Sequence, residues 1–176
     1  MALKNIAVQI GLPFGLGSIT GDWAPGTAER SAAWDMYVEM ITRVTVVELG
    51  ETEGLLREAL TSFYSLFGTT RCILKTGGPE LARSRGGQVS FAHLAISILN
   101  GAVRPLLAEW HPRLEDHENE RPADASRVVW ERQWQHNDEL RSAIGDVRCT
   151  LFDYAVLLGE VCGAESLLPL AAETDN

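Results

Sequence analysis

The chain has 176 residues, which suits one ordinary domain, and its 45% hydrophobic content is enough to form a core. It carries 24 acidic and 15 basic residues, and the resulting formal net charge of −9 argues against nonspecific nucleic-acid binding and against anionic membrane surfaces. The three cysteines, Cys72, Cys149 and Cys162, form no Cys-x-x-Cys pair, and we interpret them as buried, reduced thiols of a cytoplasmic protein.

Residues 1–26 are expected to form an extended, glycine-rich N-terminal arm. Apolar side chains alternate with other residues from position 5 to position 10, which is the period of a β-strand. A loop rich in glycine and proline then continues as far as Gly26. The strand has no predicted partner in the chain, so the arm either lies on the helical part or is donated to another chain. The predicted interface consists of Ile6, Val8, Ile10 and Trp23.

The first two helices are expected before and after Gly50, and the sequence does not define sharply where the first one ends. Thr27 suits the N-cap of the first helix. The second helix should begin near Thr52 or Glu53 and stop at the double glycine and proline of residues 77–79. The predicted buried face of the first helix comprises Trp34, Val38, Ile41, Thr45 and Leu49. A local basic cluster near the end of the second helix either complements the helix dipole or contacts an anion; it comprises Arg71, Lys75, Arg83 and Arg85.

The third helix is predicted to start after Ser90 and to kink or break near residues 101–104, because Pro105 has no N–H for the helical ladder. The fourth helix should run from about Ser126 to Cys162, with Gly163 ending it. Residues 164–176 then form a C-terminal tail.

Four amphipathic segments joined by mostly short connections predict an all-α fold, an antiparallel four-helix bundle of residues 27–163 with the extended N-terminal arm. The tryptophans are expected in its core, or at an interface if several are exposed together. No membrane segment is expected, because the most apolar stretch, from Phe91 to Ala108, is interrupted by His93, Asn100 and Arg104.

Several cofactor and metal sites lack the residues that they need. No histidine follows an acidic residue by three positions, which excludes the Glu-x-x-His pattern of di-iron bundles. The glycines at positions 15 and 17 are not followed by a phosphate-loop lysine, and no βαβ pattern supports a dinucleotide fingerprint. His111, Glu115 and His117 do not share one helix face. We therefore predict neither a metal nor a cofactor.

Arg104 and His111 form the one pair of residues that suggests catalysis. Seven residues turn a helix by about 700°, so the two side chains should point the same way, two turns apart. A guanidinium that stabilises phosphate charge and an imidazole that handles a proton suit RNA cleavage. Alternatively, Arg104 pairs with an acidic neighbour and His111 ends a helix.

This Arg-x6-His spacing, in a bundle of this size, resembles the R-x4–6-H motif of the HEPN superfamily of small all-α proteins in prokaryotic toxins and defence systems. The resemblance rests on this motif and on size. It implies a metal-independent ribonuclease in which Arg104 stabilises phosphate charge and His111 is the acid/base, with two copies usually forming one site. Two residues depart from the pattern. Pro105 replaces the usual polar residue, and Pro112 biases His111 away from helical geometry.

The absence of catalytic motifs, the wide apolar helical surface and the unpaired strand favour a non-enzymatic helical protein-interaction or regulatory module. We expect it to form a homo-oligomer or to bind a protein partner. Its general character suits an accessory component of a bacterial defence or signalling assembly, by analogy alone. The alternative is the HEPN-like ribonuclease, with RNA as substrate. A third interpretation is a small-ligand sensor with a pocket between helices.

Overall fold

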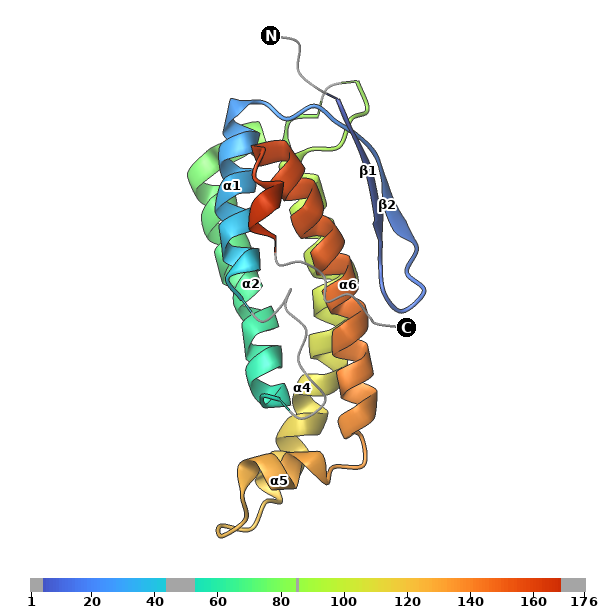
Figure 1. Ribbon diagram of the computed structural model, residues 1–176. Coiled ribbons are helices and arrows are strands. Elements are labelled where there is room, and N and C mark those ends of the chain that lie inside the picture. The colour runs from blue at the N-terminus through green and yellow to red at the C-terminus, as the bar shows by residue number, and fades with distance from the viewer. Residues whose placement is uncertain (1–4, 44–52, 85, 169–176) are drawn as a thin grey trace.

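The computed structural model describes residues 5–43, 53–84 and 86–168, and 69% of these described residues are helical. The long helices run lengthwise beside one another, and α5 crosses the end of the molecule (Figure 1). The helices are α1 (Thr27–Ile41), α2 (Leu56–Gly77), α3 (Phe91–Ile98), α4 (Arg104–Asn119), α5 (Arg127–Arg132) and α6 (Asn137–Cys162). Short 3₁₀ turns lie at Gly78–Ala82 and Glu165–Leu167. The prediction of a mostly helical fold is confirmed.

The N-terminal strand has a partner within the chain, so the prediction of a purely all-α fold with a lone strand is wrong. β1 (Ile6–Gly11) pairs antiparallel with β2 (Ser18–Trp23), a segment for which the sequence predicts a loop. Only Ile19 and Trp23 of β2 are buried, so its sequence lacks the alternation by which a strand is recognised. The hairpin lies along α6, where the Thr150 hydroxyl donates to the Gly11 carbonyl at 2.7 Å.

This hairpin buries the side chains that we predicted as an interface. Ile6, Val8 and Ile10 are 2–5% exposed, and Trp23 is fully buried. All of them belong to one hydrophobic cluster that also contains the apolar faces of the helices. They therefore build the core of this chain and are not presented to another one.

Helix α1 buries a different face from the one predicted. Its N-cap is Gly26, and Thr27 is the first helical residue. Trp34 is 43% exposed, whereas Ala33, Tyr37 and Met40 are buried. Both stripes have helical spacing, so the sequence period alone could not choose between them. The predicted face positions Thr45 and Leu49, like the boundary near Gly50, lie outside the described residues.

Helix α2 begins at Leu56, a few residues after the predicted start, and ends at Gly77 as predicted. Gly78 follows with a φ of +68°, a left-handed conformation that glycine adopts without a Cβ clash.

The third predicted helix is continuous across the expected break. A π-helical turn at Leu99–Val103 joins α3 to α4, and the Arg104 N–H donates to the Leu99 carbonyl five residues back. The wide turn accommodates Pro105, which cannot donate to the ladder. Helix α4 also contains Pro112 without ending, so His111 keeps helical geometry.

Among the described residues, one helical stretch, Phe91–Asn119, is long and apolar enough for a membrane span. Its most apolar window is 56% buried within the fold, as expected for a core helix of a soluble protein.

The fourth predicted helix is two helices, because the chain turns between Arg132 and Asn137. Ser126 caps α5 as predicted for a helix start, and α6 ends at Cys162 with Gly163 at a φ of +66°. The cysteines differ from their prediction, since Cys72 and Cys149 are exposed and Cys162 is partly exposed.

Candidate functional site

Arg104 and His111 both line a groove between α2 and the continuous helix formed by α3, the π turn and α4 (Phe91–Asn119), which is called the α3–α4 rod below. The groove has a volume of about 650 Å³ and is called the α2/α4 groove below. Both residues therefore face the same side of the rod, as their spacing predicts. No hydrogen bond joins them in the described part of the chain; their predicted catalytic roles remain predictions. The lining consists of Tyr64, Phe67, Thr70, Arg71, Leu74, Ile96, Leu99, Asn100, Arg104, Leu107, Ala108 and His111.

One wall of the groove is a single stripe of α2, since positions 64, 67, 71 and 74 recur at helical spacing. The opposite wall comes from α3, the π turn and α4. The two walls run in opposite directions, because Arg57 near the start of α2 contacts His111, whereas Phe67 further along lies beside Arg104. Tyr64 is 61% exposed and Ile96 is 47% exposed, so the groove presents apolar surface to solvent.

Arg104 is held on the wall by two contacts. Its Nε donates to Asn100 Oδ1 at 2.9 Å, and its guanidinium carbon lies 5.1 Å from the centroid of the Phe67 ring. These contacts use the Nε edge and one face of the guanidinium. The alternative prediction, in which Arg104 pairs with an acidic neighbour, is not seen among the described residues. The Arg104 guanidinium is exposed and can bind an anion through its terminal nitrogens.

His111 is held by Arg57, which in turn is held by Glu118. Arg57 Nη1 lies 2.7 Å from His111 Nδ1, and Arg57 Nη2 lies 2.8 Å from Glu118 Oε2. A guanidinium only donates, so Nδ1 accepts and Nε2 must carry the ring hydrogen. Burial, and then the Arg57 charge, lower the pKa of His111. The imidazole is therefore neutral at physiological pH.

The tip of His111 is covered. Its Nε2 atom is buried and has no hydrogen-bond partner in the described residues. The Tyr64 ring stands edge-on to the imidazole, with centroids 6.2 Å apart. A general acid or base must reach the proton that it transfers, so this arrangement favours a binding or structural role for His111 over proton transfer.

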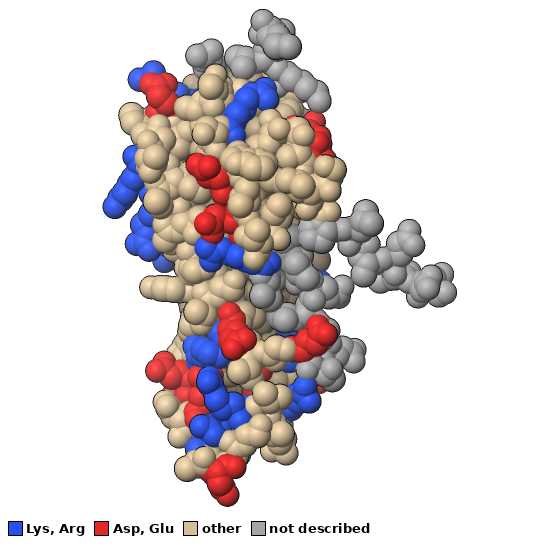
Figure 2. All heavy atoms as spheres, turned by 60° about the vertical axis from the view of Figure 1, so that its left-hand side comes forward, with Lys and Arg blue, Asp and Glu red and all other residues tan. Residues whose placement is uncertain are grey.

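The groove is positively charged, whereas the chain as a whole is negatively charged. Arg71 and Arg104 are the charged residues of its lining, and no carboxylate lies among the lining residues. On the face drawn in Figure 2, acidic and basic side chains are intermixed, most densely at the end where α5 lies. Of the basic cluster predicted from the sequence, Arg71 reaches the groove and Arg83 pairs with Glu80 at 2.7 Å. Arg85 lies outside the described residues.

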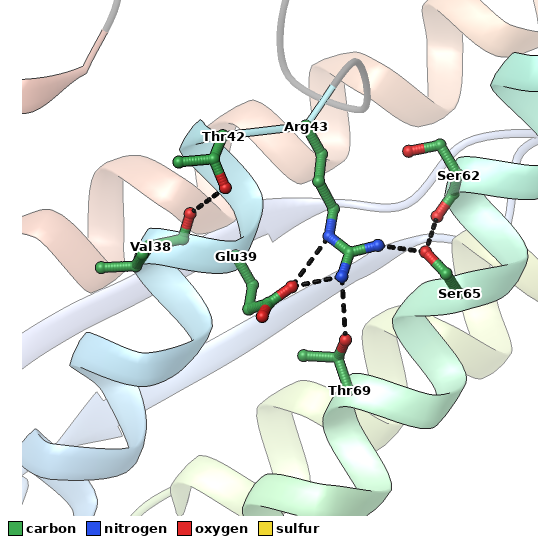
Figure 3. Close-up of polar contacts among 7 residues, drawn as sticks. All are labelled: Val38, Glu39, Thr42, Arg43, Ser62, Ser65 and Thr69. Carbon is green, nitrogen blue, oxygen red and sulfur yellow. Dashed lines mark hydrogen bonds and ion pairs between the residues drawn. The ribbon is translucent and has the colours of Figure 1, made fainter.

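A polar network outside the groove joins α1 to α2 (Figure 3). Arg43 pairs with Glu39 and donates to the Ser65 hydroxyl, and its Nη2 donates to the Thr69 hydroxyl at 3.2 Å. The Ser65 hydroxyl donates onward to the Ser62 carbonyl at 2.6 Å. These polar groups bond one another, so we interpret the network as a structural link between the helices.

An aromatic cluster joins α4, α5 and the turn between α5 and α6. The His117 ring is stacked between Trp130 and Trp134, with centroids 5.0 and 5.4 Å away. The Trp130 indole donates to the His117 carbonyl at 2.9 Å, and His117 Nε2 lies 3.0 Å from the Trp130 carbonyl. Trp110 and Trp134 are buried, as predicted for core tryptophans. The internal hydrogen bonds of His117 identify this cluster as part of the packing.

Within the described residues, no group of three or more His, Cys, Asp or Glu side chains could hold a metal ion. No family model, curated protein or solved structure matches the chain. Its function therefore has to be argued from the groove itself. The sequence did not predict that α2 forms one wall of this groove, because only the folded chain brings Tyr64 and Phe67 opposite Arg104.

Proposed function

We propose that this protein is a non-enzymatic interaction module that binds a helical segment of a partner protein in the α2/α4 groove. The observation that carries the proposal is an open groove with apolar helical walls and a positively charged centre. In this proposal α1, α2, the α3–α4 rod and α6 are the four helices of an antiparallel bundle, and the partner supplies a further helix.

The dimensions of the groove support a helical occupant. The stretch of α2 from Tyr64 to Leu74 is about 15 Å long at 1.5 Å per residue, which matches between two and three turns of a helix. Amphipathic helices bind such grooves through apolar side chains at positions i, i+3 or i+4, and i+7. The exposed Tyr64 and Ile96 stand on opposite walls and would be covered by such a helix.

Selection from a naive helical-peptide display library tests the proposal. Ala108 is exposed on the α4 wall, so Ala108→Trp should fill the groove without disturbing the core. Ser142→Trp, at an exposed site on α6, is the matched control. Peptides selected on the wild type should bind Ser142→Trp equally and lose at least tenfold in affinity for Ala108→Trp.

Two results would overturn the proposal. One is a selection that yields no wild-type binder above background. The other is a set of binders that do not distinguish the two tryptophan variants, since these would occupy another surface. Stabilisation by dodecanoate that Ala108→Trp abolishes, without any peptide binder, would identify a small amphiphile as the occupant instead.

The HEPN-like ribonuclease is the second candidate, supported by the shared face of Arg104 and His111. Labelled RNA should be incubated with the wild type, with Arg104→Ala and with His111→Ala. Equal absence of cleavage would end the nuclease proposal for the isolated protein. Cleavage that both substitutions remove would end the non-enzymatic one.

The proposal includes the expectation from the sequence that the protein is a cytoplasmic accessory component of a bacterial defence or signalling assembly. The three cysteines are free in the structure, in keeping with a reducing compartment.

A further inference from the structure

We infer that the helix bound in the α2/α4 groove carries an acidic side chain at the centre of its apolar face, and that this carboxylate binds between Arg71 and Arg104. The inference rests on the proposed function and adds the chemistry of the partner. It follows from where the charges of the groove lie and from which of their hydrogen-bonding groups are already used.

The two arginines are anchored in the same way. Arg104 uses Nε on Asn100, and Arg71 uses Nε on the Phe67 carbonyl at 3.1 Å. Neither guanidinium has a carboxylate partner within residues 5–43, 53–84 and 86–168. Their terminal nitrogens are thus left to bind an anion, and the planar guanidinium suits a carboxylate. The anchoring also reduces the side-chain entropy that binding would otherwise remove.

The arginines lie midway along the groove. Arg104 is level with Phe67, and Arg71 is one turn further along α2. Beyond them the walls carry no charged side chain: Leu74 and Ile96 line one end, and Leu107 lies at the other end with the Tyr64 ring and the neutral His111 ring. A single-headed amphiphile would need its charge at one end. The order apolar, cationic, apolar therefore matches a helix with apolar residues at i and i+7 and a carboxylate at i+3 or i+4.

The groove also discriminates against other helices. A basic side chain at the central position would meet two like charges, and a neutral one would leave the arginines without the ion pair. Because the whole chain carries a net charge of −9, long-range attraction does not draw in an acidic partner. Recognition must therefore come from close contact with Arg71 and Arg104.

The sequences of the selected peptides are the first test. They should carry Asp or Glu between two apolar anchors. A synthetic binder with its central Glu changed to Gln should bind about tenfold more weakly, and one with Lys should bind more weakly still. Arg104→Gln or Arg71→Gln should remove the difference between the Glu and Gln peptides, as measured by fluorescence anisotropy. Arg113→Gln, on α4 but outside the groove, should retain it.

Charge exchange keeps the inference testable if affinity falls for other reasons. The variant Arg104→Glu should bind the Lys peptide better than the Glu peptide. Groove binders without a central acid, or an unchanged Glu-to-Gln ratio in both glutamine variants, would overturn this inference while leaving the proposed function standing. A selection that yields no groove binder would overturn both.

Discussion

Removal of the Glu29 carboxylate should be among the most destabilising single changes in this chain. Glu29 is 7% exposed, and its oxygens accept three hydrogen bonds from three different segments. Oε1 accepts from the Trp23 indole at 3.1 Å and from the Phe91 N–H at 2.8 Å, and Oε2 accepts from the Gly26 N–H at 3.0 Å. One side chain thus ties β2 to the first turns of α1 and α3.

The magnitude follows from the groups that a substitution leaves unpaired. In Glu29→Ala, the buried Trp23 and Phe91 donors lose their acceptor at about 1–3 kcal/mol each, and loss of the Gly26 bond adds about 0.5–1 kcal/mol. The total, about 2.5–7 kcal/mol, is a large part of the ~5–15 kcal/mol stability of an ordinary domain. Glu29→Gln keeps one oxygen for the Trp23 and Phe91 donors, so it should cost about 1–2 kcal/mol.

Urea denaturation followed by far-ultraviolet circular dichroism measures both variants. The reasoning predicts the order wild type, Glu29→Gln, Glu29→Ala, with the alanine variant the least stable. A loss of stability below about 1 kcal/mol for Glu29→Ala would refute the reasoning, because two buried donors left without an acceptor should cost more than that. Equal losses in the two variants would show that the charge, and not the hydrogen-bond geometry, supplies the stability.

Three further changes test other parts of the fold. Trp134→Ala should lower the free energy of unfolding by about 3–5 kcal/mol in urea titrations, because its buried indole packs edge-on to Trp110. Burial raises the pKa of the Glu131 carboxyl in the folded state. The protonated carboxyl therefore stabilises the fold fully below the ordinary glutamate pKa, and this stabilisation is lost as the pH rises through the raised pKa of the folded state. The stability of Glu131→Gln should lack this fall with pH, and a fall of equal size would contradict the assignment. Gly163→Ala, at a φ of +66°, should lower the thermal midpoint, whereas Gly145→Ala, where a Cβ meets nothing within 4 Å, should raise it.

The helices were predictable where local chemistry determined them. The double glycine and proline of residues 77–79 end α2 in the structure as in the prediction, and Gly163 ends α6. The buried face of α1 was not predictable, because Trp34 and Tyr37 both belong to helical stripes. Only the packing of α6 against α1 selects Tyr37, whose hydroxyl donates to the Ala164 carbonyl at 2.8 Å.

The second strand and half of the groove depend on contacts between distant residues. In β2, exposed Thr20, Gly21 and Asp22 separate the buried Ile19 from the buried Trp23, so no local period marks a strand. For the groove, the spacing of residues along one helix correctly placed Arg104 and His111 on one face. The contact of His111 with Arg57 crosses 54 residues, and no pattern within a helix could indicate it.

The π turn between α3 and α4 determines how the residues of one groove wall are aligned. On an uninterrupted α-helix, the lining positions from Leu99 to Ala108 would spread over about 180° of the rod. The extra residue in the wide turn rotates α4 back by roughly 100°, which brings these positions into a narrower arc that faces α2. Gly101 lies in the same turn, and a Cβ there would come within 2.9 Å of the Leu12 side chain from the hairpin. The turn that Pro105 favours therefore meets the hairpin through Gly101 and aligns the groove wall that carries Arg104. A regular helix could not align these groove positions in the same way, so the proposed binding of a partner helix in the α2/α4 groove depends on the π turn.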